Sequence, residues 1–361
     1  MKNLSKRDSI KIQTAADINS PKIRRFIAEN GNLIWKFAKE IFMLIEAARG
    51  EYTDLRIPGI VATAGGALLR FCECRRSKSD WADIDISVSR SADGAQSWDQ
   101  VLVIKSEGNT LNNPVAIAAE DKIFFLYLKN YKELYLKVST DDGITYSESR
   151  RIDVDSLVDF FYNAVAVGPG HGIYHQGRIL VPMWFAYSKR DPKDHRPSFI
   201  AILYSDDCGE SWHIKRILED ASLNNPSECA LATDADGRVL ISIRHEGKEK
   251  CRAISISPDG VSDWSTPVLE KSLPDPICMG GMTHNNGVIY HSNCSSSSAR
   301  ENLVINTTSD AFKSMRTFAV SDKGGYSDMA ILRDEIYIYY EKVSDAGRFE
   351  LHLDKINLKD L

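Results

Sequence analysis

The sequence has no long hydrophobic run: nowhere in its 361 residues do about 18 consecutive apolar residues occur. A membrane-spanning helix needs roughly 20 such residues, so no membrane span is expected. The sequence also lacks an excess of basic charge, because 45 Lys and Arg stand against 50 Asp and Glu, a formal net charge of −5. Nonspecific binding to a polyanion requires a basic field, and we therefore expect no nucleic-acid partner.

Cysteine is sparse, with seven residues in the whole chain, and the close pair Cys72 and Cys74 lacks the spacing of zinc ligands. Buried free thiols and no metal site are therefore predicted. No glycine-rich phosphate loop leads from a strand into a helix, so no nucleotide cofactor is expected. Residues 1–20 contain no apolar segment of the kind found in secretory signals, which predicts a cytoplasmic location. A secreted or periplasmic location is the alternative if a signal was removed before residue 1.

A helical pattern covers residues 21–48. Pro21 stands at a first-turn position, and apolar residues such as Ile34, Phe37 and Ile41 recur at helical spacing. The pattern predicts a short N-terminal helical extension over residues 1–50, followed by a domain over residues 51–361. Amphipathic helices usually pack on their own chain, so a cover for this domain is favoured. Contact with a second copy, giving a homo-oligomer, is the alternative.

From about residue 55 onward, short alternating or apolar runs separated by Gly, Asp, Asn and Pro predict strands and hairpins. A turn motif of the form SxDxGxxW recurs among them at 91–98, 139–146, 205–212 and 257–264, with Ala95 and Val261 at positions where glycine is usual. The intervals of 48, 66 and 52 residues approximate one four-stranded propeller blade. Serine and aspartate side chains satisfy turn amides, and the aromatic residue packs between strands. The repeat predicts an all-β propeller.

Short motifs stand between these turns in a defined order: RIP (56–58), DWADIDI (80–86), NNPSECALA (224–232), ARENL (299–303), GGYSD (324–328) and YYEK (339–342). Together with the SxDxGxxW turns, which are called Asp boxes in that family, they make the chain from about residue 55 to 345 resemble the sialidase family of glycoside hydrolases. The resemblance implies a six-bladed β-propeller and a retaining exo-α-sialidase that removes terminal sialic acid from glycoconjugates.

Three arginines match those that bind the substrate carboxylate in this family: Arg56, Arg244 and Arg300. Arginine suits that role because its fork of donors fits both carboxylate oxygens and stays charged. Glu341 resembles the carboxylate that braces the first arginine. By the same similarity, Asn113 is expected to line the cleft.

The resemblance assigns the nucleophile to Tyr326 and its base to Glu228. A neutral phenol avoids the repulsion that a carboxylate nucleophile would meet beside the substrate's own carboxylate. Asp80 matches the acid/base residue. Proton donation near neutral pH calls for a raised pKa, which we expect desolvation by Trp81 and by the substrate to supply. Asp83, in the same motif, is the competing candidate.

Two positions depart from the family pattern. Met279 and Tyr174 stand where glutamine is common, near the glycerol and N-acyl side of the family's substrate. These departures leave open a glycosidase or transglycosylase for a related Kdn- or Kdo-like ulosonic acid. The charged segment 187–198 is predicted to be a surface loop that borders the cleft. A noncatalytic carbohydrate-binding propeller is the alternative from another functional class.

Overall fold

The computed structural model describes residues 52–219 and 223–361. The chain divides into two units, Met1–Tyr52 and Thr53–Leu361, and every described strand belongs to the second unit. The helix predicted over residues 21–48, and the oligomer contact predicted for it, lie outside the described residues. Within the described ranges, no helix is long and apolar enough to cross a membrane.

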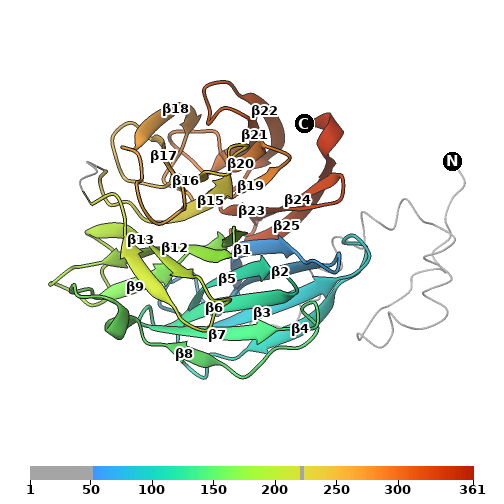
Figure 1. Cartoon of the computed structure of the whole chain (residues 1–361). Coiled ribbons are helices and arrows are strands. Elements are labelled where there is room, and N and C mark those ends of the chain that lie inside the picture. Colours follow the sequence, from blue (N-terminus) through green and yellow to red (C-terminus); the bar gives the residue numbers. More distant parts are fainter. Residues whose placement is uncertain (1–51, 220–222) are drawn as a thin grey trace, which may run out of the picture. The chain divides into compact units, whose positions relative to one another are not determined.

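Six antiparallel sheets follow one another along the chain, coloured from blue to red in Figure 1. The first sheet contains β1 (Asp54–Ala62), β2 (Leu68–Arg75), β3 (Ile84–Ser91) and β4 (Asp99–Ile104). The second contains β5 (Leu111–Ala119), β6 (Lys122–Lys129), β7 (Glu133–Ser139) and β8 (Arg150–Ile152), and β10 (Gly170–His171) joins β5 in parallel. The short 3-10 helix η1 (Val154–Leu157) follows β8.

The third sheet has a divided first strand, because β9 (Ala164–Val167) and β11 (Ile173–His175) both pair with β12 (Arg178–Ala186). β13 (Ser198–Ser205) and β14 (His213–Arg216) complete it. The fourth sheet contains β15 (Cys229–Thr233), β16 (Val239–Ile243), β17 (Cys251–Ser257) and β18 (Val268–Pro274). The fifth contains β19 (Met282–Asn285), β20 (Val288–Cys294), β21 (Glu301–Thr308) and β22 (Arg316–Lys323).

The last sheet has three strands, β23 (Ser327–Leu332), β24 (Glu335–Val343) and β25 (Phe349–Asn357), followed by the 3-10 helix η2 (Leu358–Asp360). It closes the ring against the first sheet. Ile60 of β1 donates its backbone N–H to Asp328 Oδ2 of β23 at 2.9 Å, and His171 Nδ1 of β10 lies 2.8 Å from Asp328 Oδ1. The fold is therefore the predicted six-bladed β-propeller.

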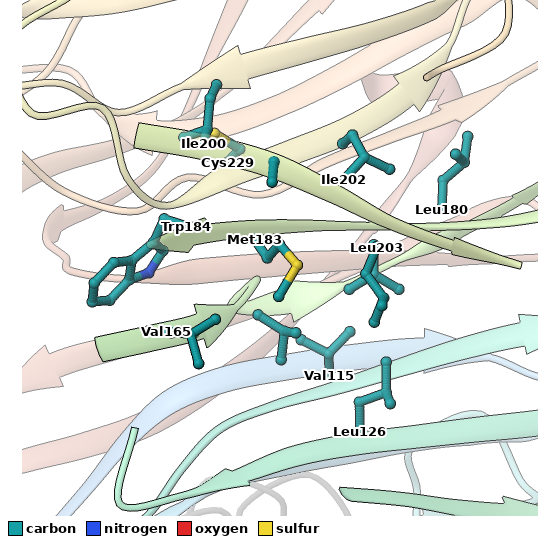
Figure 2. Close-up of a cluster of buried hydrophobic side chains, with 14 of the residues drawn as sticks. Val115, Leu126, Val165, Leu180, Met183, Trp184, Ile200, Ile202, Leu203 and Cys229 are labelled. Carbon is teal, nitrogen blue, oxygen red and sulfur yellow. The ribbon is translucent and has the colours of Figure 1, made fainter. Parts of the chain in front are cut away.

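The core lies between neighbouring sheets. Some inner strands are apolar over most of their length, as in β12, where eight of nine residues are buried. Figure 2 shows part of the largest cluster, in which Val115, Met183 and Leu203 pack together and Trp184 lies at one end. All seven cysteines are free; six are buried, and Cys208 is partly exposed.

The Asp-box turns join the third and fourth strands of each of the first five sheets. In the turn after β13, Ser205 Oγ donates to Asp207 Oδ1 at 2.8 Å, and Asp207 accepts from the Ser211 backbone N–H at 2.9 Å. The same network recurs after β21, where Asp310 accepts from Thr308 Oγ1 at 2.9 Å. This fifth box was not predicted.

The box at 257–264 corrects one expectation. Gly260, rather than Val261, takes the glycine position: it has φ +78 and donates its N–H to Ser257 Oγ at 2.9 Å. The turn is one residue shorter there. At 91–98, Ala95 does adopt the left-handed conformation usual for glycine, with φ 67.

Candidate active site

A polar pocket opens at the end of the sheets opposite the Asp-box turns. Most of its lining residues lie where the first strand of a sheet begins or where the second strand of a sheet ends. All six described sheets, with the loops that join their strands, contribute to it. Its lining includes most of the predicted site residues: Arg56, Asp80, Asn113, Glu228, Arg244, Arg300 and Tyr326. The structure thus brings together side chains that are up to 270 positions apart in the sequence (Arg56 to Tyr326).

Arg56 is fixed by a fully buried carboxylate. Its Nε and Nη2 donate to Glu341 Oε1 and Oε2 at 3.0 and 3.1 Å, and Arg300 Nη1 lies 3.8 Å from Glu341 Oε2. Burial disfavours the ionised carboxylate, but the charges of Arg56 and Arg300 prevail and hold the pKa of Glu341 below its ordinary value. Glu341 therefore has the bracing position that was predicted, and it holds two guanidinium groups at the same side of the pocket.

Tyr326 and Glu228 are in direct contact. The Tyr326 hydroxyl lies 2.7 Å from both carboxylate oxygens of Glu228, and Arg244 Nη1 donates to the same hydroxyl at 2.8 Å. Arg244 Nη1 also pairs with Glu228 Oε2. Burial raises the pKa of the Tyr326 phenol well above its usual range, although the charge of Arg244 opposes the rise. A neutral phenol with a carboxylate at hydrogen-bond distance is the arrangement that a base-assisted nucleophile requires.

Two arginine side chains lie against the Tyr326 ring. The guanidinium carbon of Arg300 is 4.9 Å from the ring centroid and that of Arg56 is 5.4 Å away. Three guanidinium groups, those of Arg56, Arg244 and Arg300, thus surround one phenol. An anionic group placed above the ring would meet all three.

Asp80 lies in the β2–β3 loop with its side chain half exposed. Arg75 Nη1 donates to Asp80 Oδ1 at 2.7 Å, and Arg56 Nη1 is 3.9 Å from the same oxygen. Desolvation acts to raise the pKa of Asp80, but the charge and hydrogen bond of Arg75 outweigh it and lower the pKa below the ordinary value. In the free protein the pKa of Asp80 is therefore lowered, whereas the raised pKa predicted from the sequence depends on a bound substrate as well as on Trp81.

Asp83, the competing acid candidate, points elsewhere. Arg76 Nη1 donates to Asp83 Oδ1 at 3.0 Å, and Ser106 Oγ contacts the same oxygen. Asp83 does not line the pocket. Of the two aspartates, Asp80 alone lines the pocket that also contains Arg56 and Tyr326.

Arg75 and Glu73 form a buried network under Asp80 that was not predicted from the sequence. Arg75 Nε donates to Glu73 Oε2 at 2.7 Å, and Glu73 Oε1 accepts from the Asn113 backbone N–H at 2.8 Å. Both charged side chains are at most 1% exposed. The network ties β2 to β5 and places Asn113 at the pocket, as predicted. A signal is present in the sequence, because Glu73 and Arg75 interrupt an otherwise apolar strand at the spacing of one face.

The residues that the structure describes contain no group of three or more His, Cys, Asp and Glu side chains placed to hold a metal ion. The carboxylates of the pocket are paired with arginines, as in Glu228 with Arg244 and Glu246 with Arg196. The arrangement is that of a site for an anionic organic molecule.

Comparison with known proteins agrees with this geometry. Residues 66–338 match the family of BNR repeat-like domains. The chain belongs to this family. It is 25% identical over 355 residues to a sialidase of Bacteroides fragilis, a match covering 85% of this chain and 62% of the relative. It is 28% identical over 193 residues to human sialidase-3, covering 50% of this chain and 44% of that protein. The chain thus spans less than two thirds of the length of these relatives.

Solved structures of other proteins have a similar fold. A Hadza microbial sialidase superposes with a TM-score of 0.74 at 23% identity, covering 87% of this chain and 67% of that one. A Trypanosoma rangeli sialidase in complex with 2,3-difluorosialic acid superposes with a TM-score of 0.66 at 20% identity, covering 85% and 54%. The predicted family resemblance and six-bladed fold are confirmed.

Part of the pocket lining is aromatic, and its rings gather around His195. The ring centroid of His195 lies 4.7 Å from that of Tyr131, 5.2 Å from that of Trp184 and 5.9 Å from that of Trp81. His195 and Arg196 belong to the segment 187–198, which borders the pocket as predicted. Neither Tyr131 nor Trp184 was predicted from the sequence. Trp184 lies within the apolar strand β12, and such a position carries no signal of its own in the sequence.

Two further predicted residues lie outside the pocket lining. Met279 is buried behind the site in a cluster with Ile57, Cys278 and Tyr326. The Tyr174 hydroxyl donates to Glu120 at 2.8 Å, and its ring packs against the core at the pairing of β11 with β12. The structure therefore places neither side chain in the lining of this pocket, and the substrate contacts predicted for them remain a prediction.

Proposed function

We propose that this chain is a retaining exo-α-sialidase that hydrolyses terminal sialic acid from glycoconjugates. The observation that carries the proposal is the convergence of three arginines, Arg56, Arg244 and Arg300, on the Tyr326–Glu228 pair in one pocket. Sialic acid is a ulosonic acid, so its anomeric carbon bears a carboxylate. The arginines would hold that carboxylate, which sets the anomeric carbon beside the Tyr326 hydroxyl.

In the first step, Tyr326 Oη attacks the anomeric carbon while its proton passes to Glu228. The bond between the anomeric carbon and the glycosidic oxygen breaks, and Asp80 donates a proton to the departing oxygen. In the second step, Asp80 takes a proton from water, and the water oxygen attacks the anomeric carbon. The bond to Tyr326 breaks, and Glu228 returns the proton to the phenol oxygen. Two displacements give net retention.

The low pKa of Asp80 in the free protein is compatible with this role. A bound substrate places its carboxylate against Arg56, which partly neutralises one of the cations beside Asp80, and its sugar ring removes water from the half-exposed side chain. Both changes favour the protonated carboxyl. We infer that substrate binding itself prepares Asp80 to act as an acid.

The names of the relatives support the proposal. The protein of Aspergillus fumigatus that is 23% identical over 329 residues is an exo-alpha-sialidase, and the Trypanosoma rangeli complex with 2,3-difluorosialic acid is described as a covalent intermediate. A noncatalytic carbohydrate-binding propeller, the rival from another functional class, has no need of Tyr326, Glu228 and Asp80 in one pocket. Hydrolysis or transfer of a related ulosonic acid would use the same residues. The reaction products distinguish these activities from the hydrolysis of sialic acid glycosides.

The test is to follow the products by proton NMR on aryl glycosides of sialic acid, Kdn and Kdo, and on sialyllactose. We expect the α-anomer of free sialic acid to form first and then to mutarotate. A 2,3-difluorinated sialic acid should label the peptide that contains Tyr326, as detected by mass spectrometry. Tyr326→Phe should fold normally, because Glu228 still pairs with Arg244, and should lose nearly all turnover and all labelling. Initial release of the β-anomer, or labelling of another residue, would refute the mechanism.

A further inference from the structure

Two lysines lie near Asp80. Lys78 belongs to the same β2–β3 loop, two residues before Asp80, and donates its Nζ to the Gly347 carbonyl at 2.7 Å, which places its ammonium beside the β24–β25 turn. Lys193 Nζ lies 5.5 Å from the centroid of the ring of Trp81, the residue after Asp80. Both lysine side chains belong to exposed residues.

These two ammonium groups differ from the other cations nearby. Arg76 pairs with Asp83 and Asp85, Arg190 with Asp194, and Arg196 with Glu246. Within residues 52–219 and 223–361, neither Lys78 nor Lys193 is within ion-pair distance of a carboxylate. Lys78 is held by a neutral carbonyl and Lys193 by an aromatic face, so both charges are positioned but not neutralised.

Asp80 fixes where the leaving group must lie, given the proposed function. The acid has to be within hydrogen-bond distance of the glycosidic oxygen, so the first sugar of the leaving group departs past Asp80 and its neighbour Trp81. The face of Trp81 and the two ammonium groups therefore border the path of that sugar. An aromatic face favours a pyranose ring, and unneutralised cations favour an anion.

We propose that the Lys78–Asp80–Lys193 rim is a leaving-group subsite that selects aglycones carrying a negative charge on the sugar next to the scissile bond. A carboxylate on a second ulosonic acid and a sulfate on a neutral sugar share this chemistry. The inference rests on the proposed function and adds the substrate class to it. Exposed ion pairs are weak, so the preference is modest, about two- to fivefold for each lysine at low salt.

The experiment compares kcat/KM on four substrates: an aryl sialoside, sialyllactose, sialyllactose sulfated on galactose, and an α-linked sialic acid dimer. For each enzyme, the measured quantity is the ratio of kcat/KM on an acidic aglycone to kcat/KM on sialyllactose. Lys78→Gln and Lys193→Gln should each lower this ratio about two- to fivefold, and sodium chloride should lower the wild-type ratio. Lys313→Gln is the matched control, because this exposed lysine lies in the Asp-box turn of the fifth sheet, at the opposite end of the molecule.

The two acidic substrates distinguish the sources of the charge. A fall confined to the dimer identifies a second ulosonic acid as the preferred leaving group, whereas a fall confined to the sulfated sugar identifies a sulfated glycan. Unchanged ratios in both lysine variants, or an equal change in Lys313→Gln, would refute the proposed subsite. Hydrolysis of the aryl sialoside in the same experiment would still support the proposed function. If the wild-type protein hydrolyses none of the four substrates, both proposals fall.

Discussion

Replacing Glu341 by glutamine tests whether the buried carboxylate holds the arginine side of the site together. The carboxylate accepts hydrogen bonds from Arg56 Nε and Nη2 and from the Ile57 backbone N–H at 3.0 Å, and the Tyr326 backbone N–H approaches Oε2 at 3.3 Å. Glutamine keeps one acceptor oxygen but turns an NH₂ group toward these donors. It also removes the buried counterion of Arg56, which then has only the more distant and half-exposed carboxylate of Asp80, at 3.9 Å.

Breaking one partner of a buried ion pair costs about 3–5 kcal/mol. The entropy of unfolding is about 2.1 cal/mol/K per residue, so the part of the chain from Thr53 to Leu361 gives about 0.65 kcal/mol/K, and Glu341→Gln should lower Tm by about 5–8 °C. Glu335→Gln at the start of the same strand is the control. Its carboxylate is partly exposed and pairs with Lys355 at 2.9 Å, so we expect a change of about 1 °C.

The pH dependence of the stabilisation by Glu341 has a definite sign. The pKa of Glu341 is lower in the folded protein than in the unfolded chain, so its contribution is fully present above the unfolded pKa and is lost as the pH falls through the folded pKa. The Tm difference between wild type and Glu341→Gln should therefore be largest near pH 7 and should shrink below about pH 4.5, the ordinary pKa of glutamate. Scanning calorimetry over that range measures it. A difference no larger than that of Glu335→Gln, or one that grows on acidification, would refute the reasoning.

Two further changes test the polar groups of the pocket by kinetics. Arg300→Lys keeps the charge but loses the bidentate fork, so KM on a sialoside should rise by about tenfold or more, and an unchanged KM and kcat would place Arg300 outside the carboxylate site. Asp80→Ala should reduce kcat/KM by about 10²–10⁴ on sugar-linked substrates and much less on aryl glycosides, whose phenolate leaves with little protonation. Asp83→Ala should show no such dependence on the leaving group, and a selective loss in that variant would reverse the assignment.

The propeller was predictable because its turns are local. Ser205, Asp207 and Gly209 satisfy one another within a few residues, so their spacing appears directly in the sequence. The fifth box escaped notice because Thr308 replaces serine and Phe312 takes the glycine position with φ 69. What it retains is the aspartate and the serine that follows it, too little to recognise without the three-dimensional turn.

The catalytic candidates were predictable only through their family motifs. Glu228 and Arg244 face each other across the β15–β16 pair, but Tyr326 comes from the sixth sheet, and nothing in the spacing places it beside them. The resemblance supplied that step. The aromatic residues Tyr131 and Trp184 lie outside those motifs and were missed. Their role depends on how the third sheet packs on the second, which is a long-range property.

The pKa of Asp80 shows where reasoning from neighbours in the chain fails. Trp81 suggested a desolvated carboxyl, yet Arg75 decides the outcome from the adjoining strand, because its guanidinium reaches Asp80 and Glu73 at once. The fully buried Glu73 keeps that arginine in place, and removing Arg75 would leave Glu73 buried without a counterion. The network thus fixes the position of Asp80 at the expense of its proton affinity. Under the proposed mechanism, the proton affinity needed for acid catalysis would come from the substrate, whose carboxylate would offset the charge of Arg56 and whose ring would exclude water, so that Asp80 would act as an acid only in the complex.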